Sequence, residues 1–215
     1  MPDTHGRWCL VVPVKRLALA KTRMSPAYDL HRRDLALAFA LDTTKAALAS
    51  DAVRAVLVVT DEPEVADLLA AAGADVVGDE PDAGLNPALA HGAAAAAAAH
   101  PGCGVGALSA DLPSLRSAEL SRALERAASH ETSFVRDAAG IGTTLVLARS
   151  LPAFRPEFGA DSARRHAAAG CAEIAGDDIP SVRQDVDTND DLAVARLLGL
   201  GPQTSQLLAG IREVG

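Results

Sequence analysis

WCLVVPV, residues 8–14, decides the fold class of this chain. A short continuous apolar run of this kind is typical of a strand that is buried on both faces of a parallel sheet. Further strands are predicted at residues 53–60, 74–77, 104–109, 132–135, 143–148 and 181–186. Helices are predicted between them, at residues 29–49, 62–72, 86–100, 117–128, 161–169 and 189–198. This alternation predicts an α/β fold with three layers, in which helices flank a mostly parallel sheet.

The length and composition suit one globular domain. The chain has 215 residues, of which 49% are hydrophobic and 22% are charged. We therefore expect a single domain over residues 1–215, with residues 200–215 as a C-terminal tail or a closing helical turn. A net charge of -8 and an aromatic content of 3% argue against nucleic acid as a partner, because that function needs basic patches and stacking platforms.

The cysteines and the apolar segments point to the cytoplasm. The three cysteines, Cys9, Cys103 and Cys171, form no CxxC pair, so neither a zinc site nor a disulfide framework is indicated. The apolar run after the polar N-terminus lacks a cleavage site typical of a signal peptide. No apolar stretch approaches the ~20 residues of a membrane span, so we expect no membrane association.

Positive charge gathers directly after the first predicted strand. Two of the three lysines, Lys15 and Lys21, lie there. They are accompanied by Arg16, Arg23, Arg32 and Arg33. Ligands of parallel α/β sheets bind outside the carboxyl ends of the strands, so this cluster is a candidate polyphosphate site. The alternative is a solvated charged loop, and a Walker loop is excluded because the segment has no glycines.

Carboxylates follow two other predicted strands. Asp111 ends the strand at 104–109, where a single carboxylate suits Mg²⁺. Asp185 and Asp187 alternate on the strand predicted at 181–186 and are therefore expected to share one face. The alternative is capping: a turn cap by Asp111, and a helix cap by Thr188 or Asn189 with acids in the first turn.

Two later segments offer groups that would suit a second anion. Gly159 and Ser162 lie at the start of a predicted helix, where free backbone N–H groups are expected, and Thr143 and Thr144 begin a predicted strand. Each of these two segments is equally compatible with an ordinary cap and no ligand. Asn86 is compatible with capping its helix or with binding a base or ribose. The six histidines show no metal-ligand spacing.

Taken together, these motifs resemble a known family of enzymes. They are similar to the guanylyltransferases that activate phosphoenolpyruvate or 2-phospho-L-lactate in making the deazaflavin coenzyme F-420. That family shares a nucleotide-diphospho-sugar-transferase-like, Rossmann-like fold with molybdenum-cofactor guanylyltransferases. The matching segments are 13–15, 21–23, 84–86, 110–113, 142–144, 158–162 and 185–188. Met24, where a leucine is expected, and Ile141, where a smaller or polar residue is usual, depart from the pattern.

The resemblance implies transfer of GMP from GTP to the phosphate of phosphoenolpyruvate or 2-phospho-L-lactate. Implied catalytic residues are Lys15, Lys21, Arg23 and Asp111; implied nucleotide-binding residues are Pro13, Lys15, Lys21, Asn86 and Asp111. Mg²⁺ is implied as cofactor, with Asp111, Asp187 and Asp185 as its ligands. Thr144, Gly159 and Ser162 are implied to hold the acceptor, with Thr143 as the alternative hydroxyl.

The sequence leaves several alternatives open. A nucleotidyltransferase with a sugar-phosphate or molybdopterin acceptor would share the fold and the metal site. A non-catalytic nucleotide-binding protein would bind GTP without forming pyrophosphate. The identity of the phosphorylated acid, the preference for guanine and the oligomeric state, with a homodimer as one option, are also open.

Overall fold

The computed structural model describes residues 8–14, 24, 26–80 and 82–213. Its centre is a seven-stranded sheet with the order β3-β2-β1-β4-β6-β5-β7. The strands are β1 Trp8–Pro13, β2 Val53–Val59, β3 Asp75–Val77, β4 Gly104–Leu108, β5 Thr132–Arg136, β6 Thr143–Ala148 and β7 Ala172–Glu173. Strand β6 runs antiparallel to both of its neighbours, β4 and β5, whereas the other pairings are parallel. The mostly parallel sheet expected from the sequence is confirmed.

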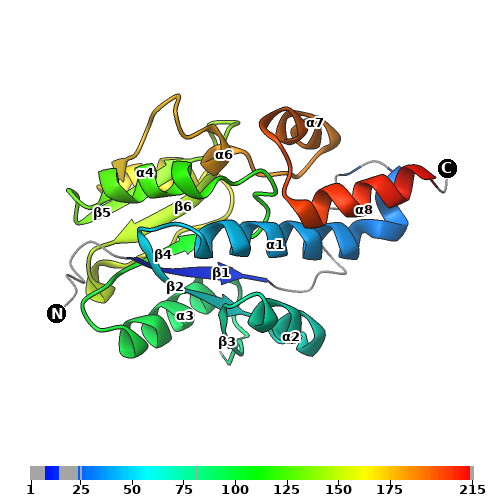
Figure 1. The fold of residues 1–215 in the computed structure, drawn as a ribbon. Helices are drawn as coiled ribbons and strands as arrows, with labels where there is room; N and C mark the ends of the chain where they lie inside the picture. Colours follow the sequence, from blue (N-terminus) through cyan, green and yellow to red (C-terminus); the bar gives the residue numbers. More distant parts are fainter. Residues whose placement is uncertain (1–7, 15–23, 25, 81, 214–215) are drawn as a thin grey trace.

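Helices cover both faces of the sheet, as Figure 1 shows. They are η2 Pro26–His31, α1 Arg32–Leu48, α2 Pro63–Ala71, α3 Leu85–Ala99, α4 Ser117–Ala127, η3 Leu151–Ala153, α5 Ser162–Ala168, α6 Pro180–Arg183, α7 Asn189–Leu198 and α8 Pro202–Glu213. Helices α1, α2, α4 and α6 contribute to the core on one face, and α3 and α5 contribute to the core on the other. The three-layer arrangement is therefore confirmed.

Strand β1 is buried on both faces, as its continuous apolar sequence predicts. Leu10 and Val12 belong to the core beneath α1, whereas Val11 belongs to the core beneath α3. Small residues let α3 approach the sheet closely, since a Cβ atom added at Gly92 would lie 2.6 Å from a Val11 methyl and 2.7 Å from a Val59 methyl. The alanine-rich segment thus packs as a helix against the central strands, with its small side chains setting the distance.

The strand predicted at 181–186 is wrong. Residues 180–183 form helix α6, and the chain continues without a strand to α7. Pro180 occupies the first helical position, where its missing N–H costs nothing. The buried carboxylate of Glu119 then accepts hydrogen bonds from the Ser181 N–H at 2.8 Å and the Ser181 hydroxyl at 2.7 Å. Helix α6 is therefore stabilised by a partner that is 62 residues away in the sequence. As a consequence, Asp185 and Asp187 do not lie on a strand.

Of the two options for residues 200–215, a tail or a closing helical turn, the structure has a helix, α8, over Pro202–Glu213. Helix α8 lies along α1, and its first turn is anchored by Asp42 of α1. The Asp42 carboxylate accepts from the Gln203 N–H at 3.0 Å and from the Thr204 N–H at 2.8 Å. The N–H groups in the first turn of a helix have no acceptor within that helix. The Asp42 carboxylate supplies the acceptor and so caps the N-terminus of α8.

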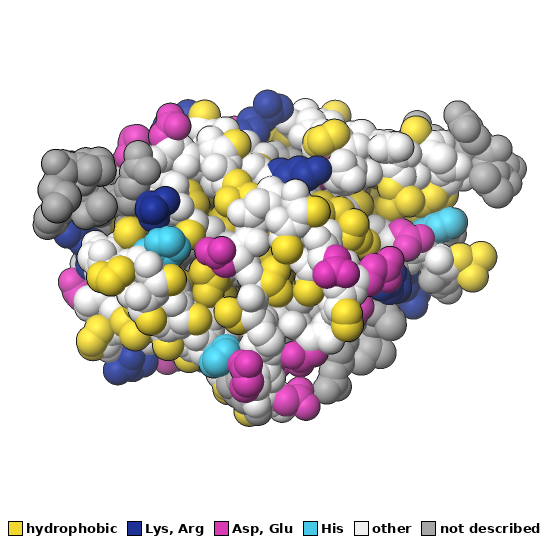
Figure 2. Space-filling model, turned by 60° about the horizontal axis from the view of Figure 1, so that its bottom comes forward, with side chains coloured by type: hydrophobic (Ala, Val, Ile, Leu, Met, Phe, Trp, Pro, Cys, Tyr) yellow, Lys and Arg dark blue, Asp and Glu magenta, His cyan; other side chains and the backbone are white. Residues whose placement is uncertain are grey.

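The surface mixes charged and apolar groups. Figure 2 shows acidic, basic and hydrophobic side chains interspersed over one face of the molecule. Among the described residues, no helix has the length and apolar character needed to cross a bilayer.

Candidate active site

Asp111 lies just beyond the carboxyl end of β4, in the middle of the sheet. The ladder between β4 and β6 is extended by the Ser109 N–H, which donates to the Thr144 carbonyl at 2.8 Å. The chain then leaves the sheet, and the Asp111 carbonyl accepts from the Val186 N–H at 3.1 Å. Asp111 is partly exposed, and this backbone bond attaches its loop to the segment that carries Asp185 and Asp187.

Four carboxylates gather at this edge of the sheet. Burial, followed by the negative charges of Asp111, Asp137 and Asp187, raises the pKa of Asp185 to about 7. Burial is the largest cause of this shift. The charges of the other three acids also act on Asp185, which places these groups in its vicinity, since repulsion between exposed, distant charges is screened. Asp185 is half-buried and Asp187 is exposed. The structure therefore brings together the three acids named from the sequence, without the strand that was expected to align them.

The start of α7 fixes the exposed end of this acidic group. Thr188 is its N-cap: the Thr188 hydroxyl accepts from the Asp191 N–H, and the Asp191 carboxylate accepts in return from the Thr188 N–H at 2.8 Å. The same carboxylate accepts from the Asp187 N–H at 3.1 Å. The capping predicted for Thr188 is confirmed, and it leaves the carboxylates of Asp185 and Asp187 outside the cap.

The donor set suits a hard divalent cation that also binds phosphate. Within the described part of the chain, no group of three or more His, Cys, Asp or Glu side chains is arranged to hold a metal ion by itself. Mg²⁺ takes one or two carboxylates and completes its shell with water and substrate phosphates. Carboxylates held close enough to perturb one another fit this requirement, because a cation relieves their repulsion.

Thr143, at the start of β6, contacts His166 of α5. A register shift in the β5–β6 ladder places Thr143 opposite Arg136, although Leu145 lies opposite Val135. Because of this bulge at residue 144, Thr143 lies on the α5 face of the sheet, 3.0 Å from the His166 Nδ1 atom.

The tautomer of His166 follows from its two partners. The Glu157 N–H donates to the His166 Nε2 atom at 3.0 Å, so the ring proton belongs on Nδ1 and is donated to the Thr143 hydroxyl oxygen. His166 is 0% exposed, and burial lowers its pKa, so the ring is held neutral. The Thr143 hydroxyl, which accepts from His166, keeps its own hydrogen for another acceptor.

Thr144 occupies the bulge itself. It is 0% exposed, and among the described residues its hydroxyl has no hydrogen-bond partner. A buried hydroxyl without a partner is costly, which makes Thr144 a reasonable contact for a ligand atom. Its role in binding an acceptor stays a prediction.

Gly159 and Ser162 are brought next to Thr143 by the start of α5. The Ala163 N–H donates to the Ile141 carbonyl at 3.1 Å, which ties this helix to the β5–β6 turn. Gly159 has φ +121°, a conformation that favours glycine, and its carbonyl accepts from the Ser162 N–H at 3.2 Å. The candidate acceptor residues, which come from two separate stretches of sequence, are thus joined by the bond between α5 and the β5–β6 turn.

Asn86 has a different local role from the cap that the sequence allowed. Helix α3 is preceded by Gly84 as its N-cap. The Asn86 amide instead donates to the Phe158 carbonyl at 3.1 Å and accepts from the Phe158 N–H at 2.9 Å. This reciprocal pair attaches the start of α3 to the Gly159 segment. Helix capping by Asn86 is therefore wrong, and contact with a nucleotide stays a prediction.

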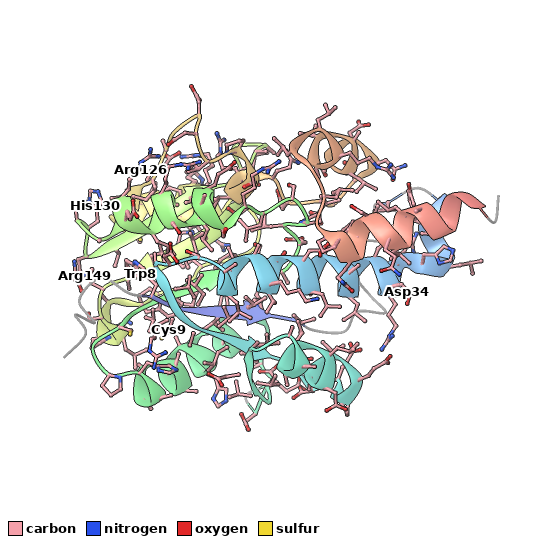
Figure 3. The ribbon with its side chains drawn as sticks, viewed as in Figure 1. Trp8, Cys9, Asp34, Arg126, His130 and Arg149 are labelled. Atoms are coloured by element: carbon pink, nitrogen blue, oxygen red, sulfur yellow. The ribbon has the colours of Figure 1, made fainter. Side chains whose placement is uncertain are left out.

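The basic residues are placed only in part. Pro13 ends β1 opposite Val59, at the same edge of the sheet as Asp111. Lys15, Lys21 and Arg23 lie outside the described residues. Figure 3 shows Arg126, His130 and Arg149 at the end of the molecule where β1 begins, away from this edge.

Sequence reasoning missed two residues of the site. Asp137 follows β5, and its carboxylate accepts from the N–H groups of Ile141 at 2.9 Å and Gly142 at 2.6 Å. An acid directly after a predicted strand was the signal that could have identified it. His166 offered no such signal, because its importance depends on a threonine 23 residues away.

Comparisons with known proteins agree with this geometry. The family described as "Guanylyl transferase CofC like" matches residues 8–213. A phosphoenolpyruvate guanylyltransferase from Thermomonospora curvata is 57% identical over 207 residues, which cover 96% of this chain and 91% of the relative.

Solved structures show the same fold at low sequence identity. A protein from Desulfovibrio desulfuricans G20, assigned to the nucleotide-diphospho-sugar transferases, superposes with a TM-score of 0.68 at 18% identity and covers 96% of this chain and 97% of its own. A Mycobacterium tuberculosis protein crystallised with manganese gives a TM-score of 0.52 at 22% identity, covering 89% and 97%.

Proposed function

The chain belongs to the family of CofC-like guanylyl transferases, and from this premise we propose that it transfers GMP from GTP to the phosphate of phosphoenolpyruvate. Pyrophosphate is the second product, and the reaction is a step in making the deazaflavin coenzyme F-420. The observation that carries the proposal is the 57% identity, over 96% of the chain, to a phosphoenolpyruvate guanylyltransferase.

The reaction needs positioning and charge neutralisation more than proton transfer. An oxygen of the acceptor phosphate attacks the α-phosphorus of GTP, and the bond from that phosphorus to the oxygen bridging to the β-phosphate breaks. The acceptor oxygen is already anionic at neutral pH, so no general base is required. What the protein supplies is alignment of two anions that repel each other.

On the nucleotide side, we assign residues at and after the end of β1, the loop after β4, and Asn86 at the start of α3. Lys15, Lys21 and Arg23 would neutralise the triphosphate and the leaving pyrophosphate, since cationic side chains next to a strand's carboxyl end suit phosphate oxygens. Pro13 and Asn86 would contact the nucleotide. Support comes from the place of Pro13 at the same edge of the sheet as Asp111.

We assign Mg²⁺ to the acidic group. Asp111 and Asp187, with Asp185 as the alternative partner, would hold the ion against the substrate phosphates. When bound, Mg²⁺ acts as a Lewis acid that withdraws charge from the reacting phosphate oxygens. Burial, together with the negative charges of Asp111, Asp137 and Asp187, raises the pKa of Asp185 to about 7, and the repulsion among these charges supports a cation at this position.

We assign the acceptor to the start of β6 and the start of α5. The hydroxyls of Thr143 and Thr144 and the Gly159–Ser162 turn would bind phosphoenolpyruvate and orient its phosphate toward the nucleotide. Support comes from the buried hydroxyl of Thr144, which has no hydrogen-bond partner among the described residues, and from the hydrogen that the Thr143 hydroxyl keeps while it accepts from His166.

A substrate matrix tests the proposal. Pyrophosphate release is measured with each of the four nucleoside triphosphates and with phosphoenolpyruvate, 2-phospho-L-lactate or 3-phosphoglycerate as acceptor. We expect release with GTP and phosphoenolpyruvate well above every other pair. Release only with a sugar phosphate or a molybdopterin acceptor would assign a different transferase.

The same assay separates an enzyme from a binding protein. A rise in melting temperature with GTP but no pyrophosphate from any pair would indicate a non-catalytic nucleotide-binding protein. A homodimer and a cytoplasmic location also stay predictions, which sedimentation at two protein concentrations and cell fractionation would test.

A further inference from the structure

A buried threonine of α1 holds the backbone on both sides of Asp111. The Thr43 hydroxyl donates to the Ala110 carbonyl at 3.2 Å and accepts from the Leu112 N–H at 3.1 Å. Thr43 is 0% exposed and is 69 residues away from Leu112 in sequence. The contact is therefore made by the tertiary fold and not by a local turn.

Asp111 depends on this contact because the sheet no longer guides the chain there. Strand β4 ends at Leu108, and Ser109 makes the last backbone bond to β6. Beyond it, the Asp111 carbonyl is held by the Val186 N–H at 3.1 Å, from the segment that carries Asp185 and Asp187. The Thr43 hydroxyl holds the two peptide groups that flank Asp111. Together these three bonds fix the backbone of Asp111, and thereby the direction in which its side chain leaves the chain.

We infer that Thr43 is a positioning residue for nucleotidyl transfer, which keeps the Asp111 carboxylate facing the segment of Asp185 and Asp187. The inference rests on the proposed function, because Asp111 is the residue assigned there to Mg²⁺. Thr43 does not contact substrate; it acts through the backbone of residues 110–112. Residues that orient metal ligands in this way affect metal affinity or activity by about 10- to 100-fold when they are changed.

The neighbouring residue supplies a matched control. Thr44 is also 0% exposed and lies on the same helix, but within the described residues its hydroxyl has no hydrogen-bond partner. Valine has nearly the shape of threonine and lacks the hydroxyl. Thr43→Val therefore removes both bonds to the Asp111 loop, whereas Thr44→Val makes the same chemical change without removing a bond. Thr43→Ser keeps the hydroxyl and tests rescue.

Two measurements separate positioning from simple packing. The first is kcat for pyrophosphate release at saturating GTP and phosphoenolpyruvate, with Mg²⁺ varied. The second is binding of Mn²⁺ to the GTP-bound protein without acceptor, followed by electron paramagnetic resonance. For Thr43→Val we expect kcat and Mn²⁺ affinity to fall by about 10-fold or more, with the KM values for both substrates changed by less than about 3-fold. Thr43→Ser and Thr44→Val should stay close to the wild type in both measurements.

Equal losses in Thr43→Val and Thr44→Val would overturn the inference, as would a Thr43→Val protein that melts earlier but keeps wild-type kcat and Mn²⁺ binding. If Thr43→Val does not fold, Thr43→Cys gives the same comparison, because a thiol is a weak donor and a weak acceptor. Failure of the proposed function would look different. The wild type would then release no pyrophosphate from GTP and phosphoenolpyruvate, while the Mn²⁺ measurement would still decide the role of Thr43.

Discussion

Asp111 shows at the residue scale how the role of a side chain depends on its neighbours. A single carboxylate after a strand is compatible with a turn cap. Here its charge contributes to raising the pKa of Asp185, its carbonyl bonds to Val186, and Thr43 holds the peptide groups on either side. These contacts hold the backbone around Asp111, and a cation-binding role for its carboxylate stays a prediction.

Replacing Asp111 by Asn should abolish turnover while the protein stays folded. The change keeps the shape of the side chain and removes the charge that would hold Mg²⁺. Loss of a group that stabilises charge in a transition state costs on the order of 100-fold or more in kcat. Pyrophosphate release at saturating Mg²⁺, alongside a circular dichroism melt, measures both effects. Asp187→Asn should behave likewise. A fully active Asp111→Asn protein would contradict the metal assignment. If Asp185→Asn loses activity and Asp187→Asn does not, Asp185 is the acid that binds the ion together with Asp111.

His166 should make the folded protein sensitive to acid. Burial lowers its pKa in the folded state, with the charge of Arg165 acting in the same direction and that of Glu157 opposing it. As the pH falls below about 6.5, the ordinary histidine value, the unfolded chain takes up a proton before the folded protein does. The stability that His166 contributes is therefore complete above that pH and is lost toward the lower, folded pKa.

Thermal melts between pH 5 and pH 8 test this expectation. The His166→Gln protein should lose less of its melting temperature on acidification than the wild type. His130→Gln is the control, because His130 is exposed at the opposite end of the molecule, as Figure 3 shows. The reasoning fails if the two variants show the same pH dependence.

At the scale of elements, α1 connects the site to the C-terminal helix. Two consecutive residues of α1 do this: Asp42 caps α8, and Thr43 holds the Asp111 loop. The loop and the approach to α8 also meet directly, since the Gly201 N–H donates to the Pro113 carbonyl at 2.7 Å. Figure 1 shows α8 lying along α1, so the end of the chain supports the helix that positions the site.

Asp42→Ala should destabilise the fold more than a surface change on the same helix. Asp42 is 5% exposed, and its removal leaves two helix N–H groups without their partner. A lost cap of this kind costs about 1–2 kcal/mol, which corresponds to a fall of roughly 2–8 °C in melting temperature for a chain of this size. Asp34→Ala is the control, because Asp34 is exposed and its side chain lies 3.9 Å from His31. Equal melting temperatures for the two variants would exclude the capping role.

At the scale of the whole molecule, the proposed function divides the site residues into two sets. We assign the nucleotide to the end of β1, the basic segment that follows it and the loop after β4, and the acceptor to the start of β6 and the start of α5. We infer that residues 1–215 work as one domain, because the site combines segments from residue 13 to residue 187 and α8 is fastened to α1.

This separation predicts opposite kinetic effects for the two sides. Ser162→Ala and Thr144→Val should each raise the KM for phosphoenolpyruvate by about 2- to 10-fold and leave that for GTP nearly unchanged, since a neutral hydrogen bond is worth about 0.5–1.5 kcal/mol. Lys21→Ala should lower the efficiency with GTP by roughly 10- to 100-fold, as expected for a charge-assisted contact. Lys45→Ala, a change of the same charge on α1, is the control.

Kinetics with one substrate varied at saturation of the other decide between these outcomes. Loss of GTP use in the Ser162 and Thr144 variants, with phosphoenolpyruvate unaffected, would mean that the two sides are assigned the wrong way round. Equal effects of Lys21→Ala and Lys45→Ala would mean that the basic segment is only solvated.

The sequence by itself determined the fold class and the family. Continuous apolar runs such as that of β1 indicate burial on both faces, and the strands predicted at 132–135 and 143–148 are present as β5 and β6. Two further features were predicted from local signals that need no distant partner. The apolar run before Asp111 predicts the end of a strand, and the acids after Thr188 predict the capped start of a helix. These features follow from periodicity and local hydrogen bonding, which a sequence records directly.

Tertiary structure decided the features that depend on partners distant in the chain. Helix α6 forms where a strand was predicted because Glu119 accepts from Ser181, and the end of the chain is a helix, α8, that Asp42 caps. The bulge at Thr144 turns Thr143 toward His166, and Thr43 reaches the Asp111 loop from another helix. Each of these contacts joins residues that are far apart in the sequence, and such contacts leave no periodic pattern in it. The partners of these buried polar groups can therefore be identified only in the folded structure.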